Sequence, residues 1–170
     1  MCWDNQVLLF AATHRSDGLD GFFRGATWLG SLYLLAPLAV LTAGVLLSLE
    51  KRLEAGLLLI GFGGATLWVH LAKILLARPR PDLVQPLIAL PTGASFPSAH
   101  TMQIAAFALC MVLIIRRTLP EWQLAAMVVA FVLVVVVGTS RVYLQVHFPS
   151  DVLGGVALGI AWVAVVHKLL

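Results

Sequence analysis

Five long apolar stretches, each bounded by charged residues or prolines, dominate the pattern of hydrophobic and polar positions along the chain. They cover residues 28–49, 55–76, 98–115, 122–139 and 149–166. An α-helix needs about 20 apolar residues to cross a hydrocarbon core of about 30 Å, so each stretch can form one transmembrane helix. The valine-rich run at 132–137 would suit a strand in a soluble protein, but an open strand leaves its backbone polar groups unpaired in lipid. The pattern therefore predicts an all-α, integral membrane helical bundle with about five transmembrane helices.

The first 27 residues have a different pattern. Charged residues flank the short apolar run at 7–12, and aromatic residues are interleaved with them. Cleaved signal peptides have a basic start and a longer apolar core, so this segment is not expected to be one. We predict a short amphipathic helix on the membrane surface, with a plain linker as the alternative. The interfacial segment 1–27 and the transmembrane core 28–170 form one domain, 1–170, as expected for a chain of this length.

Composition supports the membrane assignment. Of the 170 residues, 61% are hydrophobic and 11% are charged, whereas soluble domains are about half apolar and about a quarter charged. The net charge of +3 is small and no basic run is interleaved with aromatic residues, so no nucleic-acid partner is expected. Two cysteines, Cys2 and Cys110, do not make a disulfide framework, and Cys110 is expected to be a small buried residue.

The reactive side chains are concentrated in two connections between the predicted helices. If these helices cross the membrane in turn, the loop after the second and the loop after the fourth lie on the same side. The opposite side then holds the turn at 50–54, the basic pair at 116–117 and the last residues, which are ordinary anchoring groups. The side with the two loops gathers most of the polar residues with reactive groups, namely Lys73, Arg78, Arg80, Ser98, His100, Ser140, Arg141, His147 and Asp151.

This cluster has the chemistry of a site for a multiply charged oxyanion. It contains several cations and no acidic cluster, and Ser98 is a favourable N-cap for a helix whose N-terminus would offer free N–H groups. Arginine forks match phosphate oxygens, and lysine adds a point charge. With two histidines available, one can attack phosphorus while the other protonates the leaving oxygen. The residues therefore indicate phosphoryl transfer.

Three other functions fit parts of the pattern. A metal-dependent membrane hydrolase would use His100, His147 and Asp151 as zinc ligands, but the neighbouring cations would repel a dication. An anion or lipid-phosphate transporter would need polar residues along its spans, but the last three predicted spans contain almost no polar residues away from their ends. A purely structural membrane protein leaves the one-sided clustering of charge unexplained. The first two stay open as alternatives to a phosphatase.

Three motifs resemble the signature of the type 2 phosphatidic acid phosphatase (PAP2) superfamily, which includes membrane lipid phosphatases and the soluble vanadium haloperoxidases. The resemblance covers residues 73–151, and ten specified positions in the right order and spacing make it specific. Ala99 departs from the pattern, because the family usually has glycine there; its backbone N–H remains, but the methyl group can narrow the pocket. The motifs are Lys73-x6-Arg80-Pro81, Pro97-Ser98-Ala99-His100 and Ser140-Arg141-x5-His147-x3-Asp151.

The resemblance implies a role for each residue of the site. His147 would be the nucleophile that forms a phosphohistidine, Asp151 would fix its tautomer, and His100 would be the general acid. Arg78 falls outside the motifs and is expected to be an interfacial anchor, and His70 is expected to pack at a helix interface. The phosphate would be held by Lys73, Arg80, Ser98, the backbone N–H of Ala99, and Arg141.

The resemblance also implies an integral membrane lipid phosphatase that needs no metal and no cofactor. Its substrate would be a phosphomonoester or diphosphate on a lipid head group, with phosphatidylglycerol phosphate, phosphatidate, undecaprenyl diphosphate and lipid A phosphate all open. Basic residues tend to stay cytoplasmic, which would place the active site on the outer, periplasmic face of a bacterial cytoplasmic membrane. The basic residues on the cytoplasmic side would be Lys51, Arg52, Arg116, Arg117 and Lys168.

Overall fold

The computed structural model describes residues 3–90 and 92–170, and Cys2 and Pro91 lie outside these ranges. The described chain is helical, as the sequence predicts. Its elements are, in order, α1 (Trp3–Thr13), α2 (Asp17–Ala26), the 3-10 turn η1 (Thr27–Gly30), α3 (Leu32–Ser48), α4 (Arg52–Leu76), α5 (Ala99–Thr118), the 3-10 turn η2 (Pro120–Trp122), α6 (Gln123–Tyr143) and α7 (Pro149–Leu169).

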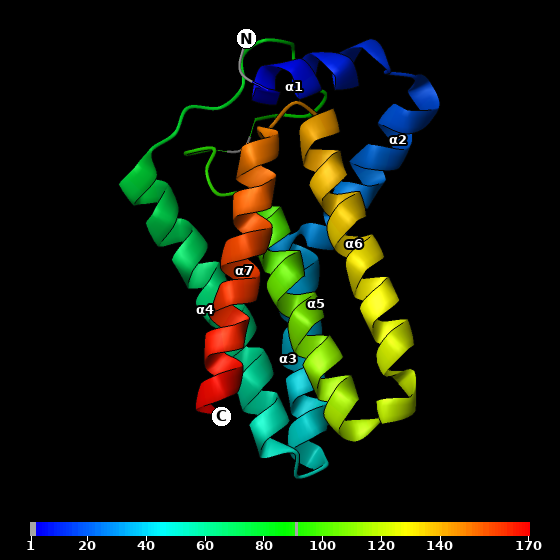
Figure 1. Ribbon diagram of the computed structural model, residues 1–170, viewed down its shortest axis with the longest axis vertical. Coiled ribbons are helices and arrows are strands. Elements are labelled where there is room, and N and C mark those ends of the chain that lie inside the picture. The colour runs from blue at the N-terminus through cyan, green and yellow to red at the C-terminus, as the bar shows by residue number, and fades with distance from the viewer. Residues whose placement is uncertain (1–2, 91) are drawn as a thin grey trace.

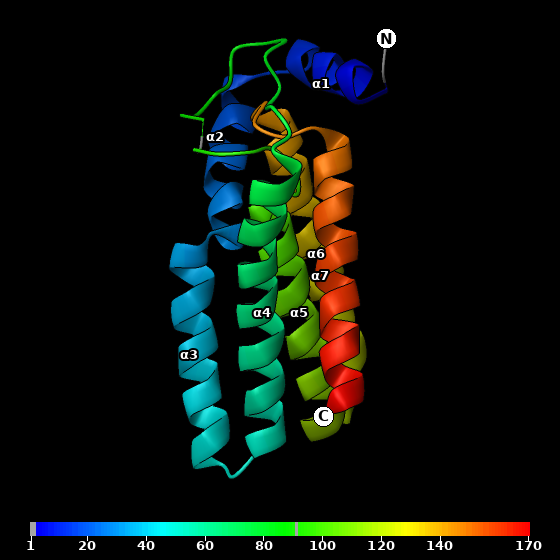
Figure 2. The same cartoon turned by 90° about the vertical axis from the view of Figure 1, so that its left-hand side faces the viewer.

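Helix α5 forms the centre of the bundle, with α4, α6 and α7 packed around it and α3 packed mainly against α4 (Figures 1 and 2). Two glycines allow α7 to approach α5 closely, because glycine has no side chain to hold the helices apart. A Cβ atom would lie 2.8 Å from the carbonyl oxygen of Ser98 at Gly155, and 2.7 Å from that of Met102 at Gly159. This packing places the start of α7 beside the start of α5, where two of the sequence motifs lie.

Among the described residues, four helices are long and apolar enough to cross a membrane, and they match the last four predicted spans. The first predicted span, 28–49, is divided instead. Ser31 has an extended backbone and caps α3, with its Oγ accepting a hydrogen bond from the Tyr33 N–H at 3.2 Å. The chain bends by 41° at this point, and residues 17–30 together with α3 make a fifth span if the bent pair is counted as one.

The N-terminal segment packs on the protein itself. Helix α1 lies across one end of the bundle, and α2 runs down beside α6 (Figure 1). Leu8 is fully buried, and its carbonyl oxygen accepts a hydrogen bond from Gln145 Nε2 at 2.9 Å. The Tyr143 hydroxyl donates to Asp20 Oδ1 at 2.6 Å. The segment predicted to lie on the membrane surface is thus tied to the connection between α6 and α7.

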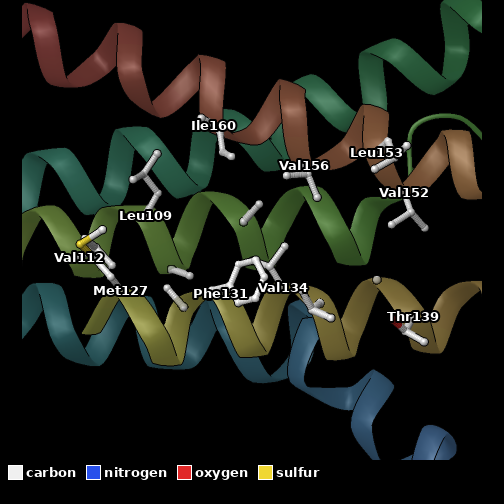
Figure 3. Close-up of a pocket in the computed structure, with 15 residues that line it drawn as sticks. Leu109, Val112, Met127, Phe131, Val134, Thr139, Val152, Leu153, Val156 and Ile160 are labelled. Carbon is white, nitrogen blue, oxygen red and sulfur yellow. The ribbon is translucent and has the colours of Figure 1, made fainter. Parts of the chain in front are cut away.

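An apolar groove of about 650 Å³ lies between α5, α6 and α7 (Figure 3). Leu109, Phe131 and Val156 represent the three helices in its lining, and Thr139 is the single polar side chain among the residues that line it. A lining of this kind suits lipid hydrocarbon rather than phosphate. The groove is therefore separate from the polar cluster that the sequence identifies.

Candidate active site

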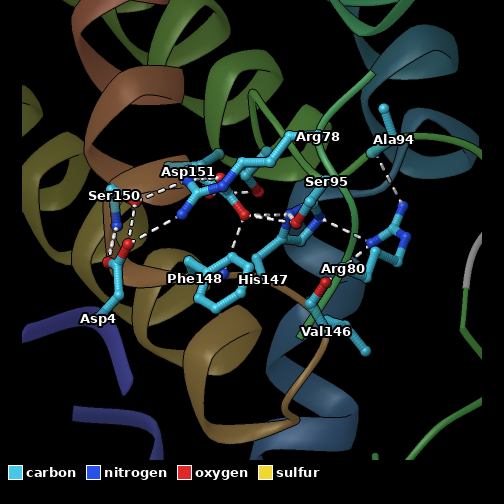
Figure 4. Close-up of polar contacts among 12 residues, drawn as sticks. Asp4, Arg78, Arg80, Ala94, Ser95, Val146, His147, Phe148, Ser150 and Asp151 are labelled. Atoms are coloured by element: carbon cyan, nitrogen blue, oxygen red, sulfur yellow. Dashed lines mark hydrogen bonds and ion pairs between the residues drawn. The ribbon is translucent and has the colours of Figure 1, made fainter. Parts of the chain in front are cut away.

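His147 and Asp151 form a buried pair at the end of the bundle that α1 covers (Figure 4). His147 lies in the short connection between α6 and α7, and Asp151 lies in the first turn of α7. Their exposed fractions are 2% and 0%. The imidazole Nδ1 is 3.5 Å from Asp151 Oδ2, and its Nε2 is 3.4 Å from Nη1 of Arg80. One ring nitrogen thus faces a carboxylate and the other faces a cation.

The carboxylate of Asp151 is held by several donors. Its Oδ2 accepts hydrogen bonds from the Ser95 hydroxyl at 2.5 Å and from the Phe148 N–H at 2.9 Å. The second of these bonds also caps the start of α7. Ser95 Oγ lies 3.4 Å from His147 Nδ1, so this hydroxyl contacts both members of the pair. Sequence reasoning missed Ser95, because one serine in a proline-rich loop carries no signal of its own.

Lys73 and Arg80 bring two positive charges to the His147 side of the site. Lys73 lies in the last turn of α4 and donates from Nζ to the carbonyl oxygen of Ala94. Arg80 follows in the loop after α4 and donates from Nη1 to the Val146 carbonyl oxygen at 2.8 Å. Both cations therefore bind the backbone of the loops around His147, and they keep further N–H donors for an oxyanion.

Arg141 is a third cation, and it is 1% exposed. Its position corrects a predicted boundary, because α6 continues beyond residue 139 to Tyr143 and carries Arg141 in its last turn. Nη1 donates to the Thr27 hydroxyl at 2.5 Å, while Nε has no partner within the described part of the chain. A buried guanidinium with donors to spare is suited to bind an anionic oxygen.

The start of α5 adds hydrogen-bond donors. Ser98 occupies the N-cap position as predicted, but its side chain does not cap the helix; Oγ accepts from the Thr101 hydroxyl at 2.9 Å instead. The Ser98 proton is therefore available to an anion. The N–H groups of the first turn, including that of Ala99, have no intrahelical partner. His100 is the second residue of α5, and the Ser98 N–H ties this helix to the Asp151 carbonyl oxygen at 3.0 Å.

The surroundings of His147 keep its imidazole neutral at pH 7. Burial lowers the pKa of His147 to about 4, and the cations Arg141, Arg80 and Lys73 lower it as well, although the hydrogen bond with Asp151 raises it. A neutral imidazole has one N–H and one lone pair. With the N–H on Nδ1, toward Asp151, the lone pair on Nε2 faces the cations and can attack an electrophile held there.

Arg78 is not an interfacial anchor, and this expectation was wrong. Its Nη1 donates to Asp151 Oδ1 at 2.6 Å, its Nη2 donates to Asp4 Oδ2 at 3.0 Å, and its Cζ lies 4.3 Å from the centre of the Phe148 ring. The left-handed backbone of Ala77, with φ of 42°, follows the end of α4 and redirects the chain toward the start of α7. Sequence reasoning could not anticipate this role, because the acidic partners of Arg78 are 73 and 74 residues away.

The remaining expectations concern residues outside the site. The Ser140 hydroxyl donates to the Val137 carbonyl oxygen of its own helix at 2.6 Å, and Cys110 is fully buried as predicted. His70 is exposed, and its Nδ1 lies 2.7 Å from the Thr66 carbonyl oxygen of its own helix, so it does not pack at a helix interface.

The fold brings the predicted site residues to one end of the bundle, namely Lys73, Arg80, Ser98, Ala99, His100, Arg141, His147 and Asp151.

Comparison with known proteins supports the same family. The model of the PAP2 superfamily matches residues 54–170. Phosphatidylglycerophosphatase B of Bacillus subtilis is 34% identical over 160 residues, which cover 92% of this chain and 78% of that protein. An undecaprenyl-diphosphatase of Sulfolobus acidocaldarius is 30% identical over 151 residues, which cover 86% of this chain and 68% of that protein.

A solved structure agrees with these relatives. The crystal structure of the transmembrane PAP2-type phosphatidylglycerolphosphate phosphatase from Bacillus subtilis superposes with a TM-score of 0.89 at 32% identity, covering 98% of this chain and 83% of that one. The family match extends over more than half of the chain and includes all three motifs. The chain therefore belongs to the PAP2 superfamily and is one of its metal-independent membrane lipid phosphatases.

Proposed function

We propose that this enzyme removes the terminal phosphate of phosphatidylglycerol phosphate through a phosphohistidine formed on His147. The observation that carries the proposal is the orientation of the His147 ring, with Nδ1 3.5 Å from the Asp151 carboxylate and Nε2 3.4 Å from the Arg80 guanidinium. A histidine nucleophile needs this arrangement, because its N–H is held by an acceptor while its lone pair is directed to the groups that bind phosphate.

The first chemical step transfers the phosphoryl group to the enzyme. Lys73, Arg80 and Arg141 hold the phosphate oxygens, with the hydroxyl of Ser98 and the first N–H groups of α5. Nε2 of His147 attacks phosphorus, the N–P bond forms, and the bond between phosphorus and the lipid oxygen breaks. His100 gives its proton to that oxygen, so the lipid leaves as a neutral alcohol.

The second step returns the enzyme to its starting form. A water molecule attacks the phosphohistidine, its proton passes to the now unprotonated His100, and the N–P bond breaks to release inorganic phosphate. Throughout both steps the cations offset the charge on the phosphoryl oxygens, which is the role of Mg²⁺ in many other phosphoryl-transfer enzymes. Three cations around a single catalytic carboxylate therefore favour an anionic substrate over a bound dication.

One relative supports a glycerophospholipid substrate, and the position of the site supports a membrane lipid of any class. The relative from Bacillus subtilis, which carries the name phosphatidylglycerophosphatase B, aligns over 92% of this chain. The site also lies at one end of a bundle whose helices are long and apolar enough to span a membrane, where a lipid head group is expected. Undecaprenyl diphosphate is the second candidate, because the undecaprenyl-diphosphatase from Sulfolobus acidocaldarius is 30% identical. Phosphatidate and lipid A phosphate complete the set to be tested.

We expect the purified protein, assayed with excess chelator, to release phosphate from phosphatidylglycerol phosphate at least about tenfold faster than from the other three lipids, judged by kcat/KM. Vanadate should inhibit the reaction, because it mimics five-coordinate phosphorus. A higher kcat/KM for undecaprenyl diphosphate would reassign the substrate to the isoprenyl class. Loss of activity in chelator, restored by zinc, would contradict the mechanism.

The active site is proposed to lie on the outer face of the membrane. The turn between α3 and α4, the turn between α5 and α6, and the C-terminus lie together at the opposite end of the bundle (Figures 1 and 2). That end carries Lys51, Arg52, Arg116, Arg117 and Lys168. Basic residues that have no catalytic role favour the cytoplasmic side, whereas Lys73, Arg80 and Arg141 serve the chemistry and do not count toward orientation.

Cysteine labelling in intact cells tests this orientation. In a background with alanine at positions 2 and 110, we expect Leu90→Cys, an exposed position in the loop before α5, to react with a reagent that cannot cross the membrane. Leu49→Cys, an exposed position at the other end, should react only after the cells are permeabilised. The reverse pattern would place the site on the cytoplasmic face.

A further inference from the structure

Helix α1 contacts the start of α7 through one buried acidic side chain, that of Asp4 (Figure 4). Asp4 is 4% exposed, and its Oδ1 accepts a hydrogen bond from the Ser150 N–H at 2.9 Å. Its Oδ2 accepts from the Ser150 hydroxyl at 2.6 Å. Ser150 is the second residue of α7, so its N–H has no partner within the helix. A carboxylate from α1 therefore satisfies the N-terminus of the helix that carries Asp151.

Arg78 extends this contact to the carboxylate that faces His147. It lies between two acidic side chains, with Nη2 3.0 Å from Asp4 Oδ2 and Nη1 2.6 Å from Asp151 Oδ1. The guanidinium also stacks on the ring of Phe148 and donates from Nη1 to Ser150 Oγ at 2.8 Å. A planar guanidinium with this many partners has little freedom to rotate, so it fixes the carboxylates that it binds.

Asp4 is charged in this position. Burial works against its ionisation, but the hydrogen bonds from Ser150 and the contact with Arg78 outweigh burial and lower the pKa of Asp4 below its usual value. At neutral pH the sequence of charges from α1 inward is therefore negative on Asp4, positive on Arg78 and negative on Asp151, and the last of these contacts the imidazole of His147.

We propose that Asp4 and Arg78 are positioning residues that act on the nucleophile through Asp151, which makes α1 a working part of the catalytic site. The proposal rests on the roles assigned above to His147 and Asp151. The positive charge of Arg78 stabilises the negative charge of Asp151 and so weakens the interaction of Asp151 with the imidazolium form of His147. Asp4 reduces this effect, because it pairs with Arg78 from the other side. The two residues therefore affect His147 in opposite directions.

Charged and titratable groups on α4, the loop after it, α5, α6 and α7 surround His147. Asp151 on α7 favours its protonated form, and Lys73 on α4, Arg80 in the following loop, and Arg141 on α6 disfavour it. His100 on α5, together with Arg78 and Asp4 one or two contacts further out, completes the set. A variant that changes one outer charge while the inner set stays in place should shift the pH at which His147 loses its proton.

The test is the acidic limb of the pH dependence of kcat/KM, measured on one substrate so that the ionisation of the substrate cancels between variants. Asp4→Asn leaves Arg78 unopposed, and we expect the limb to move to lower pH by about 0.5 unit. Arg78→Gln removes the pull on Asp151, and the limb should move to higher pH by a similar amount. Both variants should lose about tenfold in kcat with little change in KM, because the nucleophile is less well aligned.

Asp20→Asn is the matched control. Asp20 also ties the N-terminal segment to the bundle, through the Tyr143 hydroxyl, but it has no contact with Asp151. We expect Asp20→Asn to keep the acidic limb and the kcat of the wild-type enzyme. Asp4→Glu retains the charge, and we expect its acidic limb to match that of the wild-type enzyme as well. If Asp4→Asn does not accumulate as folded protein, Arg78→Gln alone carries the test.

Two results would overturn the proposal. One is an unchanged limb in Asp4→Asn or Arg78→Gln, and the other is a shift of both limbs in the same direction. Either result, with His147→Ala and Asp151→Asn still inactive, would refute the positioning role and leave the proposed mechanism intact. Full activity in His147→Ala or Asp151→Asn would instead refute the mechanism on which the inference rests.

Discussion

Replacing His147 with alanine is expected to abolish hydrolysis of both a lipid phosphate and p-nitrophenyl phosphate, by about 10⁴-fold or more. The imidazole Nε2 lies 3.4 Å from Arg80, beside the other cations of the site, so it is placed to attack a phosphorus atom that they hold. Without this nitrogen no phosphoenzyme can form, and the quality of the leaving group becomes irrelevant. Activity on both substrates, and trapping of labelled phosphoenzyme under alkaline quench, are the measurements.

His70→Ala is the matched control for this loss. His70 is exposed on α4, one turn before Lys73, and its ring contacts the backbone of its own helix. Its replacement should leave both activities and the phosphoenzyme unchanged. A labelled phosphoenzyme in His147→Ala would show that another residue is the nucleophile.

Replacing His100 with alanine is expected to lower activity on the lipid substrate by about 10²–10⁴-fold while reducing activity on p-nitrophenyl phosphate far less. A lipid alkoxide is a poor leaving group and needs a proton, which we propose that His100 supplies. A p-nitrophenolate leaves without a proton. The ratio of the two kcat/KM values is the measurement, because it separates proton donation from any general damage to the site.

Equal losses on the two substrates would contradict this assignment. They would mean that His100 binds phosphate or supports the pocket. Gly30 packs closely against the His100 backbone there, since a Cβ atom added at Gly30 would lie 3.0 Å from the His100 carbonyl oxygen. The comparison requires that cleavage of the phosphate ester limits the rate. The absence of a pre-steady-state burst of p-nitrophenolate in the wild-type enzyme would show that this step is limiting.

The transmembrane core follows from local sequence properties. An apolar stretch of about 20 residues that enters lipid must form a helix, because backbone groups find no other partners there. Hydropathy therefore predicted four spans that the structure contains. The first span was predicted less well: Ser31 interrupts it, and whether a serine within an apolar run caps a new helix depends on the packing of the segments around it.

The same contrast holds at the site. The motif residues were predicted because cations, histidines and a helix N-terminus suit phosphate chemistry, and because their order and spacing resemble the superfamily signature. Ser95, Thr27 and Asp4 were not predicted, because each has a common side chain in an undistinguished segment. Their partners lie 56, 114 and 146 residues away, so they join the site through tertiary packing.

The sequence by itself determined that this protein is a helical membrane protein and, through its three motifs, which superfamily it resembles and which residues are candidates for the site, because hydrophobic length and motif spacing are properties of short segments. The tertiary structure alone decided how those residues are supported. Nothing in the sequence shows whether Arg78 is an anchor at the membrane interface or a partner of Asp151. Asp4 belongs to a segment whose pattern indicated only a surface helix. Both roles exist because the folded chain brings α1, the loop after α4 and the start of α7 together, and buried charges must find partners wherever the fold places them.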